Sequence, residues 1–240
     1  MNNLFQVIHE DNDLLVINKP ADLVCHPTKG DAYSSLISRV RLHLGEGATP
    51  HLINRLDRET SGVVLVAKNS DVALELRRLW ENGDARKHYL AIVHGHPLEP
   101  AGRIDAPLGR DEQSVVAIKD TVRADGAAAC TEWEVTSRFE RGGRPFSLLG
   151  VRPLNGRKHQ IRIHLAHIGH PIVGDKLYGG DERCYLNFVE GRLSDAQRAA
   201  LLLPNQALHA RSLAFQWRGR EWLFEAEPEC AFNEFYRGSG

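Results

Sequence analysis

The chain has 240 residues, of which 42% are hydrophobic and 25% charged, a composition typical of a soluble globular protein. No apolar run approaches the roughly 18–20 residues that span a bilayer, and the acidic N-terminal segment does not resemble a signal peptide, so we expect a cytoplasmic protein without membrane contact. The net charge of −1, from 30 basic and 31 acidic residues, does not by itself indicate nucleic-acid binding.

The predicted elements of the first half of the chain follow no regular alternation of strand and helix. Apolar runs bounded by polar turns predict strands over residues 4–8, 13–19, 62–68 and 87–94. The strand over 62–68 is expected to be buried because its apolar residues form a continuous run. The apolar residues of 34–44 share one helical face, and a second helix is predicted to begin with Ser70 as its cap and to end at Gly83.

The second half of the chain is richer in strands. They are predicted over residues 113–119, 129–138, 145–151, 208–217 and 221–226, with helices over 157–168 and 194–203. This pattern predicts an α+β fold with a large, mostly antiparallel or mixed β-sheet flanked by helices, rather than a doubly wound parallel sheet. No repeat or linker divides the sequence, so we expect residues 1–240 to form a single domain.

An aspartate between two arginines is the first candidate site, in the segment 54–68 (NRLDRETSGVVLVAK). The guanidinium groups of Arg55 and Arg58 are expected to keep Asp57 ionised. The segment ends in the predicted buried strand, and a carboxylate on a loop anchored in this way is well placed to meet a substrate. From these residues alone, a simple surface ion pair is the commoner interpretation.

The second candidate segment is the predicted strand within 86–95 (RKHYLAIVHG). Lys87 and Tyr89 project from the same side of this strand because successive side chains alternate. Taken alone, a tyrosine on a strand packs in a core more often than it takes part in catalysis.

The third candidate segment, 152–179, begins with a basic stretch. Residues 152–164 include four basic side chains and no acidic one, which fits either a solvated face or a local groove for phosphates. Gly156 is predicted to begin a helix whose first turn carries Arg157 and Lys158, a position that attracts phosphate. Arg162 is expected on the same face as Lys158, four residues away.

Histidines in the third segment raise the alternative of a metal site. The residues concerned are His159, His164, His167 and His170, with Asp175. Their spacings of five, three and three residues do not match an HExxH site, and no glutamate lies among them. The four cysteines, Cys25, Cys130, Cys184 and Cys230, include no CxxC pair and are expected to be free thiols. We therefore expect no metal, and a metal hydrolase that uses the histidine cluster is an alternative.

Taken in this order, the segments closely resemble the RluA-type family of pseudouridine synthases over nearly the whole chain. The family pattern HRLDxxTSG is matched from Arg55 to Gly62, and KxYxAxxxG from Lys87 to Gly95. The pattern GRxHQIRxHL…GHPIxGDxxYG is matched from Gly156 to Gly179. An early NKP…HP at Asn18–Pro27 and a late LHA at 208–210 also fit.

Two positions depart from the family pattern. Asn54 stands where the family usually has His, close to Asp57, and Asp22 stands where a Gly usually follows NKPA. Neither change removes a group that the chemistry requires. The extra N-terminal RNA-binding domain that many relatives carry is not expected, because the first predicted strand already begins at residue 4.

The resemblance implies an RNA pseudouridine synthase, an isomerase that breaks the N1–C1′ bond of uridine and rejoins the base through C5 without a cofactor. It implies that Asp57 is the essential carboxylate, that Tyr89 stacks near the flipped uracil, and that Arg162 pairs with Asp57 and occupies the space left by the base. The other candidate RNA-binding residues are Arg55, Arg58, Thr60, Lys87, Arg157, Lys158, His159 and Gln160.

The expected partner is ribosomal or transfer RNA, recognised in a stem-loop by a monomer. Two alternatives from other classes stay open. A uridine glycosylase would use the same carboxylate but release free uracil. A noncatalytic RNA-binding or ribosome-assembly protein would use the same fold for binding alone.

Overall fold

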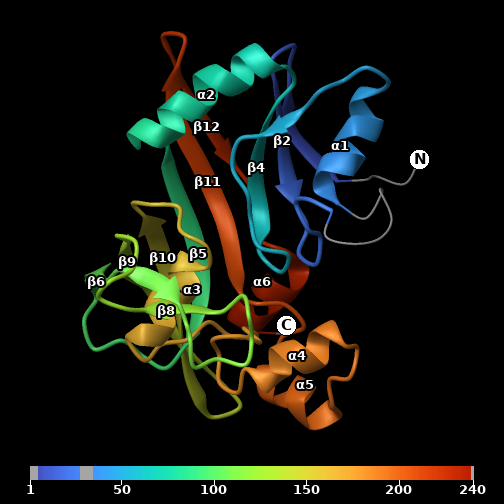
Figure 1. Cartoon of the computed structure of the whole chain (residues 1–240). Helices are drawn as coiled ribbons and strands as arrows, with labels where there is room; N and C mark the ends of the chain where they lie inside the picture. Colours follow the sequence, from blue (N-terminus) through green and yellow to red (C-terminus); the bar gives the residue numbers. More distant parts are fainter. Residues whose placement is uncertain (1–4, 28–34, 239–240) are drawn as a thin grey trace. The chain divides into compact units, whose positions relative to one another are not determined.

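The computed structural model describes residues 5–27 and 35–238 (Figure 1). The chain divides into two compact units: a first unit of residues 1–88 and 209–229, and a second unit of residues 89–208 and 230–240. Most strands belong to a large, mostly antiparallel sheet, with helices packed on it, which confirms the predicted fold class. That residues 1–240 act as a single domain stays a prediction. None of the described helices is long and apolar enough to cross a membrane.

The strands of the first unit follow the order β1-β2-β4-β11; β12 also pairs with β11, and the short β3 pairs with β4. These strands are β1 (Gln6–Glu10), β2 (Leu14–Lys19), β3 (His51–Leu52), β4 (Ser61–Ala67), β11 (Leu208–Trp217) and β12 (Arg220–Glu225). Only the β4–β11 pair among them is parallel; it aligns Ser61 with His209. All seven residues of β4 are buried, as the continuous apolar run predicts.

Two helices of the first unit, α1 (Leu36–Leu44) and α2 (Ser70–Asn82), bear apolar faces that pack inward. Val72 and Leu76 of α2 join the core formed by β2, β4 and β11. The predicted cap of α2 was wrong by one residue: the side chain of Asn69 accepts the Val72 N–H, and Ser70 is the first helical residue. Gly83 ends the helix in the left-handed conformation, as predicted.

In the second unit, the strand order is β5-β10-β9-β6 and every pair is antiparallel. Its strands are β5 (Arg86–His94, which begins in the first unit), β6 (Ala101–Asp105), β9 (Cys130–Arg141) and β10 (Arg144–Pro153), with the separate hairpin β7 (Leu108–Arg110) and β8 (Asp120–Val122). Its helices are α3 (Gln160–His167), α4 (Arg183–Val189), α5 (Asp195–Leu201) and α6 (Cys230–Arg237). Ile161 and Leu165 of α3 pack with β5 and β10 in the core.

The main error among the predicted elements is the strand over 113–119. This segment is instead the loop between β7 and β8, closed by a hydrogen bond from Asp111 N–H to the Lys119 carbonyl. Glu182 holds the loop by accepting bonds from Ser114 and Val115, a long-range contact that the local apolar pattern does not reveal. The predicted beginnings of the first strand and first helix, at residues 4 and 34, lie outside the described residues.

Candidate functional site

The loop that carries Asp57 connects β3 to β4 in the first unit. Asp57 is half-buried and follows the buried Leu56, and its carbonyl accepts the N–H of the buried Thr60 at 3.1 Å. The loop enters β4 at Gly62, whose φ of +115° and close approach to the Ala210 carbonyl leave no room for a side chain. The backbone that follows the carboxylate is therefore closely held.

Lys19 is the main tie between this loop and the end of β2. Its side chain is fully buried, and its Nζ donates to the carbonyls of Pro20 at 2.7 Å, Leu23 at 2.9 Å and Arg58 at 3.1 Å. Burial lowers the pKa of Lys19 to about 8, although Asp57 and other nearby acidic groups act in the opposite direction. The sequence contained one signal for this role, a lysine that ends an apolar strand just before a proline.

The two arginines nearest Asp57 are exposed. Arg58 Nε donates to Asp22 Oδ1 at 2.7 Å. Arg55 lies on the exposed surface of the same loop. Both side chains are accessible to solvent.

Asn54, at the position where the family usually has His, bonds to the backbone of β4. Its Nδ2 donates to the Val63 carbonyl at 3.1 Å, and its Oδ1 accepts the Leu65 N–H at 2.8 Å. An amide makes both bonds at once because it has a donor and an acceptor side by side. The substitution therefore preserves the attachment of the loop to β4.

Behind the loop, a buried histidine joins β4 to β11. His209 lies within hydrogen-bond distance of the Ala226 carbonyl through Nε2 and of the Ser61 hydroxyl through Nδ1, both at 2.9 Å. Because a carbonyl only accepts, Nε2 carries the proton and Nδ1 accepts from Ser61. Burial lowers the pKa of His209 to about 4, so this ring is neutral at physiological pH.

Lys87 and Tyr89 lie on β5, with Lys87 in the first unit and Tyr89 in the second. Both side chains are half-buried. Burial lowers the pKa of Lys87 below its ordinary value. Tyr89 packs against the hydrophobic core of the second unit.

Arg162 is held in the second unit by a buried carboxylate. Its Nε and Nη2 donate to Asp175 Oδ2 and Oδ1 at 2.7 and 2.9 Å, and the side chains are 7% and 0% exposed. Burial alone would raise the pKa of Asp175, but Arg162 and the N–H groups of Leu177 and Tyr178 outweigh it and hold that pKa below its usual value. The Tyr178 ring lies 5.0 Å from the guanidinium carbon. Sequence reasoning had considered Asp175 only as a metal ligand.

The helix that carries Arg162 begins later than predicted. His159 has a φ of +55°, which breaks the helical path, and α3 begins at Gln160. The Gln160 side chain is buried: its Oε1 accepts the Arg157 N–H, and its Nε2 donates to the Cys130 carbonyl at 2.8 Å. The prediction that Arg157 and Lys158 occupy the first helical turn, with Lys158 on the face of Arg162, was therefore wrong.

Arg157 and Lys158 instead lie on an exposed turn before α3. Arg157 Nε donates to the Ala128 carbonyl at 3.1 Å, and Lys158 Nζ lies 2.9 Å from Asp120 Oδ2. His159 lies behind them with its Nδ1 3.0 Å from the Tyr178 hydroxyl. Both cationic side chains remain partly accessible to solvent.

His164 and His170 of this segment contact oxygen atoms of the protein itself. The two ring nitrogens of the buried His164 lie 2.8 Å from Thr131 Oγ1 and 2.9 Å from the Ala106 carbonyl. His170 Nδ1 lies 2.9 Å from the His94 carbonyl. Within residues 5–27 and 35–238, no group of three or more His, Cys, Asp or Glu side chains is arranged to hold a metal ion.

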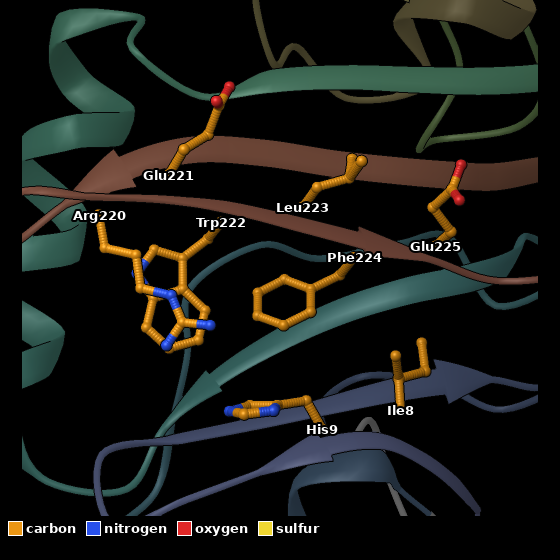
Figure 2. Close-up of a pocket in the computed structure, with 8 residues that line it drawn as sticks. All are labelled: Ile8, His9, Arg220, Glu221, Trp222, Leu223, Phe224 and Glu225. Carbon is orange, nitrogen blue, oxygen red and sulfur yellow. The ribbon is translucent and has the colours of Figure 1, made fainter.

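A surface pocket of about 460 Å³ lies in the first unit between β1 and β12 and contains none of the predicted site residues. Figure 2 shows its aromatic wall: Trp222 and Phe224 point toward His9, whereas Glu221, Leu223 and Glu225 point the other way. Trp222 pairs with Phe215, which lies about 20 Å along β11 from His209, the partner of Ser61 at the beginning of β4. The His9 ring of β1 lies 5.5 Å from the rings of Trp222 and Phe224 of β12.

Comparison with known proteins gives consistent matches. The family model described as RNA pseudouridylate synthase matches residues 13–167, which include Asp57, Tyr89 and Arg162. An uncharacterized RNA pseudouridine synthase of Chlorobaculum parvum is 36% identical over 220 residues, 88% of this chain and 66% of that protein. The ribosomal large subunit pseudouridine synthase D of Zymomonas mobilis is 32% identical over 233 residues, 92% of this chain and 68% of that protein. The chain thus spans about two thirds of the length of these relatives.

Two solved human structures share the fold. RNA pseudouridylate synthase domain containing 4 aligns with a TM-score of 0.73 and 26% identity, over 97% of this chain and 92% of that one. RNA pseudouridylate synthase domain containing 1 aligns with a TM-score of 0.73 and 25% identity, over 93% and 83% of the two chains.

Proposed function

The chain belongs to the RNA pseudouridylate synthase family, and on this premise we propose that it isomerises uridine in RNA to pseudouridine with Asp57 as its essential carboxylate. The family consists of isomerases, and the RluA-type resemblance of the sequence is confirmed. The proposal extends the activity of the family to this chain and assigns the residues that perform it.

The position of Asp57 is the observation that carries this proposal. A half-buried carboxylate sits on a loop whose backbone is fixed by Lys19, Thr60 and the glycine at the beginning of β4. Cleavage of a glycosidic bond builds positive charge on the sugar, and a fixed anion stabilises or traps that charge. Preorganisation of this kind is what a catalytic carboxylate requires.

Tyr89 and Arg162 complete the proposed catalytic set. Arg162 is suited to fill the space left by a flipped base because Asp175 fixes one edge of its planar guanidinium group. Tyr89 is proposed to stack on the uracil. Flipping the base costs about a few kcal/mol, and contacts of exposed cations with flanking phosphates are proposed to offset this cost. The cations concerned are Arg55, Arg58, Arg157 and Lys158.

We propose large-subunit ribosomal RNA as the first substrate to test, because relatives that carry this substrate in their names are 32% to 35% identical to the chain. Recognition of a stem-loop, action as a monomer and a cytoplasmic location stay predictions, as does transfer RNA as the alternative substrate.

The decisive experiment is a pseudouridine map of total RNA from a deletion strain complemented with the wild type or with Asp57→Ala. We expect one or a few sites to vanish on deletion and to return only with the wild type. Sites that return with Asp57→Ala would contradict the role of that carboxylate. Release of free uracil by the purified protein would indicate a glycosylase, and full activity in a strong chelator would eliminate a metal enzyme.

A further inference from the structure

Arg58, the residue directly after Asp57, is held at both its main chain and its side chain by one turn. Its carbonyl accepts a bond from Lys19 Nζ at 3.1 Å, and its Nε donates to Asp22 Oδ1 at 2.7 Å. The bond from Lys19 to the carbonyl involves only the backbone, so any residue at position 58 would allow it. The side chain is held by the carboxylate at position 22.

The turn that carries Asp22 is a rigid anchor. Lys19 Nζ donates to the carbonyls of Pro20 at 2.7 Å and Leu23 at 2.9 Å, on either side of Asp22. The N–H of Ala21 donates to Glu229 Oε1 at 2.8 Å. The backbone of Asp22 is therefore fixed, so its carboxylate is able to hold the Arg58 side chain in one place.

Asp22 occupies this turn at a conformational cost. Its φ of +63° lies in the left-handed region, which favours glycine and which an aspartate tolerates with strain. Strained residues persist where the surroundings hold them and cluster at functional sites. The strain is not compensated by a buried contact, since the Asp22 and Arg58 side chains are 55% and 50% exposed. An exposed ion pair adds little to stability, so stability alone does not explain an aspartate here.

We propose that Asp22 is a positioning residue for catalysis: its carboxylate holds the Arg58 side chain and thereby orients the adjacent Asp57. The proposal rests on the function proposed above. Asp22 itself touches neither substrate nor reacting atoms. Its effect reaches Asp57 through the loop, whose Thr60 N–H donates to the Asp57 carbonyl.

Two variants separate charge from strain. Asp22→Asn keeps a residue that tolerates the left-handed conformation but removes the charge, and Asp22→Gly removes both the strain and the carboxylate. For both, we expect kcat at saturating RNA to fall about tenfold with KM within about twofold, because small misplacement of a catalytic group is costly. The melting temperature should change by about 4 °C or less. If Asp22 had only a structural role, kcat would be unchanged in both variants. The only effect of Asp22→Gly would then be the relief of backbone strain.

The matched control is Asp13→Asn. Asp13 forms a partly exposed pair with Arg218 at 2.8 Å elsewhere in the first unit, so its variant should keep wild-type kcat. Arg58→Gln alone and with Asp22→Asn completes a double-mutant cycle. If Asp22 acts through Arg58, the double variant is no slower than the slower single variant.

Hydrogen exchange of the Thr60 amide provides a readout that does not depend on activity. We expect faster exchange in Asp22→Asn and Asp22→Gly than in the wild type and Asp13→Asn. If the wild type forms no pseudouridine, the proposed function fails, and the exchange rates still decide whether Asp22 holds the loop. An active wild type whose two Asp22 variants keep kcat within twofold, or an additive cycle with Arg58→Gln, would overturn the inference.

Discussion

The Asp57 loop of the first unit and the Arg162 segment of the second unit fix their functional groups in opposite ways. The loop is held through its backbone, by Lys19 and by the carbonyl of Asp57 itself, while the side chain of Arg58 reaches an exposed partner. Arg162 is held through its side chain, by two bonds to a fully buried carboxylate. One region fixes an anion and leaves it partly open to solvent, and the other buries a cation with its counter-ion.

Because of this difference, substitutions in the two regions should affect activity and stability differently. Removing the functional side chain from a loop held by its backbone leaves the fold intact, whereas removing one member of a buried ion pair leaves the other without its partner. We therefore expect the largest losses of activity from changes in the Asp57 loop and the largest losses of stability from changes around Arg162.

The largest expected effect is that of Asp57→Asn on catalysis. We expect pseudouridine formation to fall on the order of 10⁴-fold, as for loss of an essential catalytic group. Because the substitution keeps the size of the side chain, the melting temperature and RNA affinity should stay close to wild type. Tritium release from RNA labelled at C5 of uridine measures the reaction, since the base is rejoined through that carbon. An active Asp57→Asn protein would show that the Asp57 loop does not carry the essential carboxylate.

Asp175→Asn should produce the largest loss of stability. It removes the buried carboxylate from Arg162, and breaking such a pair typically costs about 3–5 kcal/mol of unfolding free energy. Urea denaturation measures the change. The control is Asp120→Asn, which breaks the more exposed pair between Asp120 and Lys158 and should cost no more than about 1 kcal/mol. Equal costs for the two variants would show that burial does not distinguish these ion pairs.

The same contrast explains which features the sequence predicts. The strand β4, the exit of α2 at Gly83 and the loop around Asp57 follow from local patterns, because apolar runs and glycines act on their neighbours in the chain. The roles of Gln160 and Asp175 depend on partners far along the chain or on burial, such as the Cys130 carbonyl. No local pattern shows these partners, so the beginning of α3 was placed too early and Asp175 was considered only as a metal ligand.

A smaller effect is expected on the pH dependence of stability, from the buried His209 of the first unit. The folded-state pKa of His209 is about 4, against an ordinary value of 6.5, so between these values the unfolded chain binds a proton that the folded chain does not. Stability is therefore lost as pH falls from about 6.5 to 4, by on the order of 3 kcal/mol from this residue. Urea denaturation across this range should show a shallower loss for His209→Gln, which keeps a donor for the Ala226 carbonyl. An unchanged pH slope would contradict the burial-based shift.

The smallest expected effect is that of Lys158→Gln, which tests whether the exposed cations of the second unit contact RNA. Its pair with Asp120 is partly exposed, so stability should change by less than about 1 kcal/mol. Loss of one phosphate contact should weaken RNA binding uniformly across sequences and reduce the slope of log affinity against log salt by about 1. Asp120→Asn is the matched control: it removes the carboxylate that competes with phosphate for Lys158 and should strengthen binding slightly. If Lys158→Gln leaves the salt slope unchanged, the lysine serves only the ion pair with Asp120, and the RNA contacts of this region must come from other side chains.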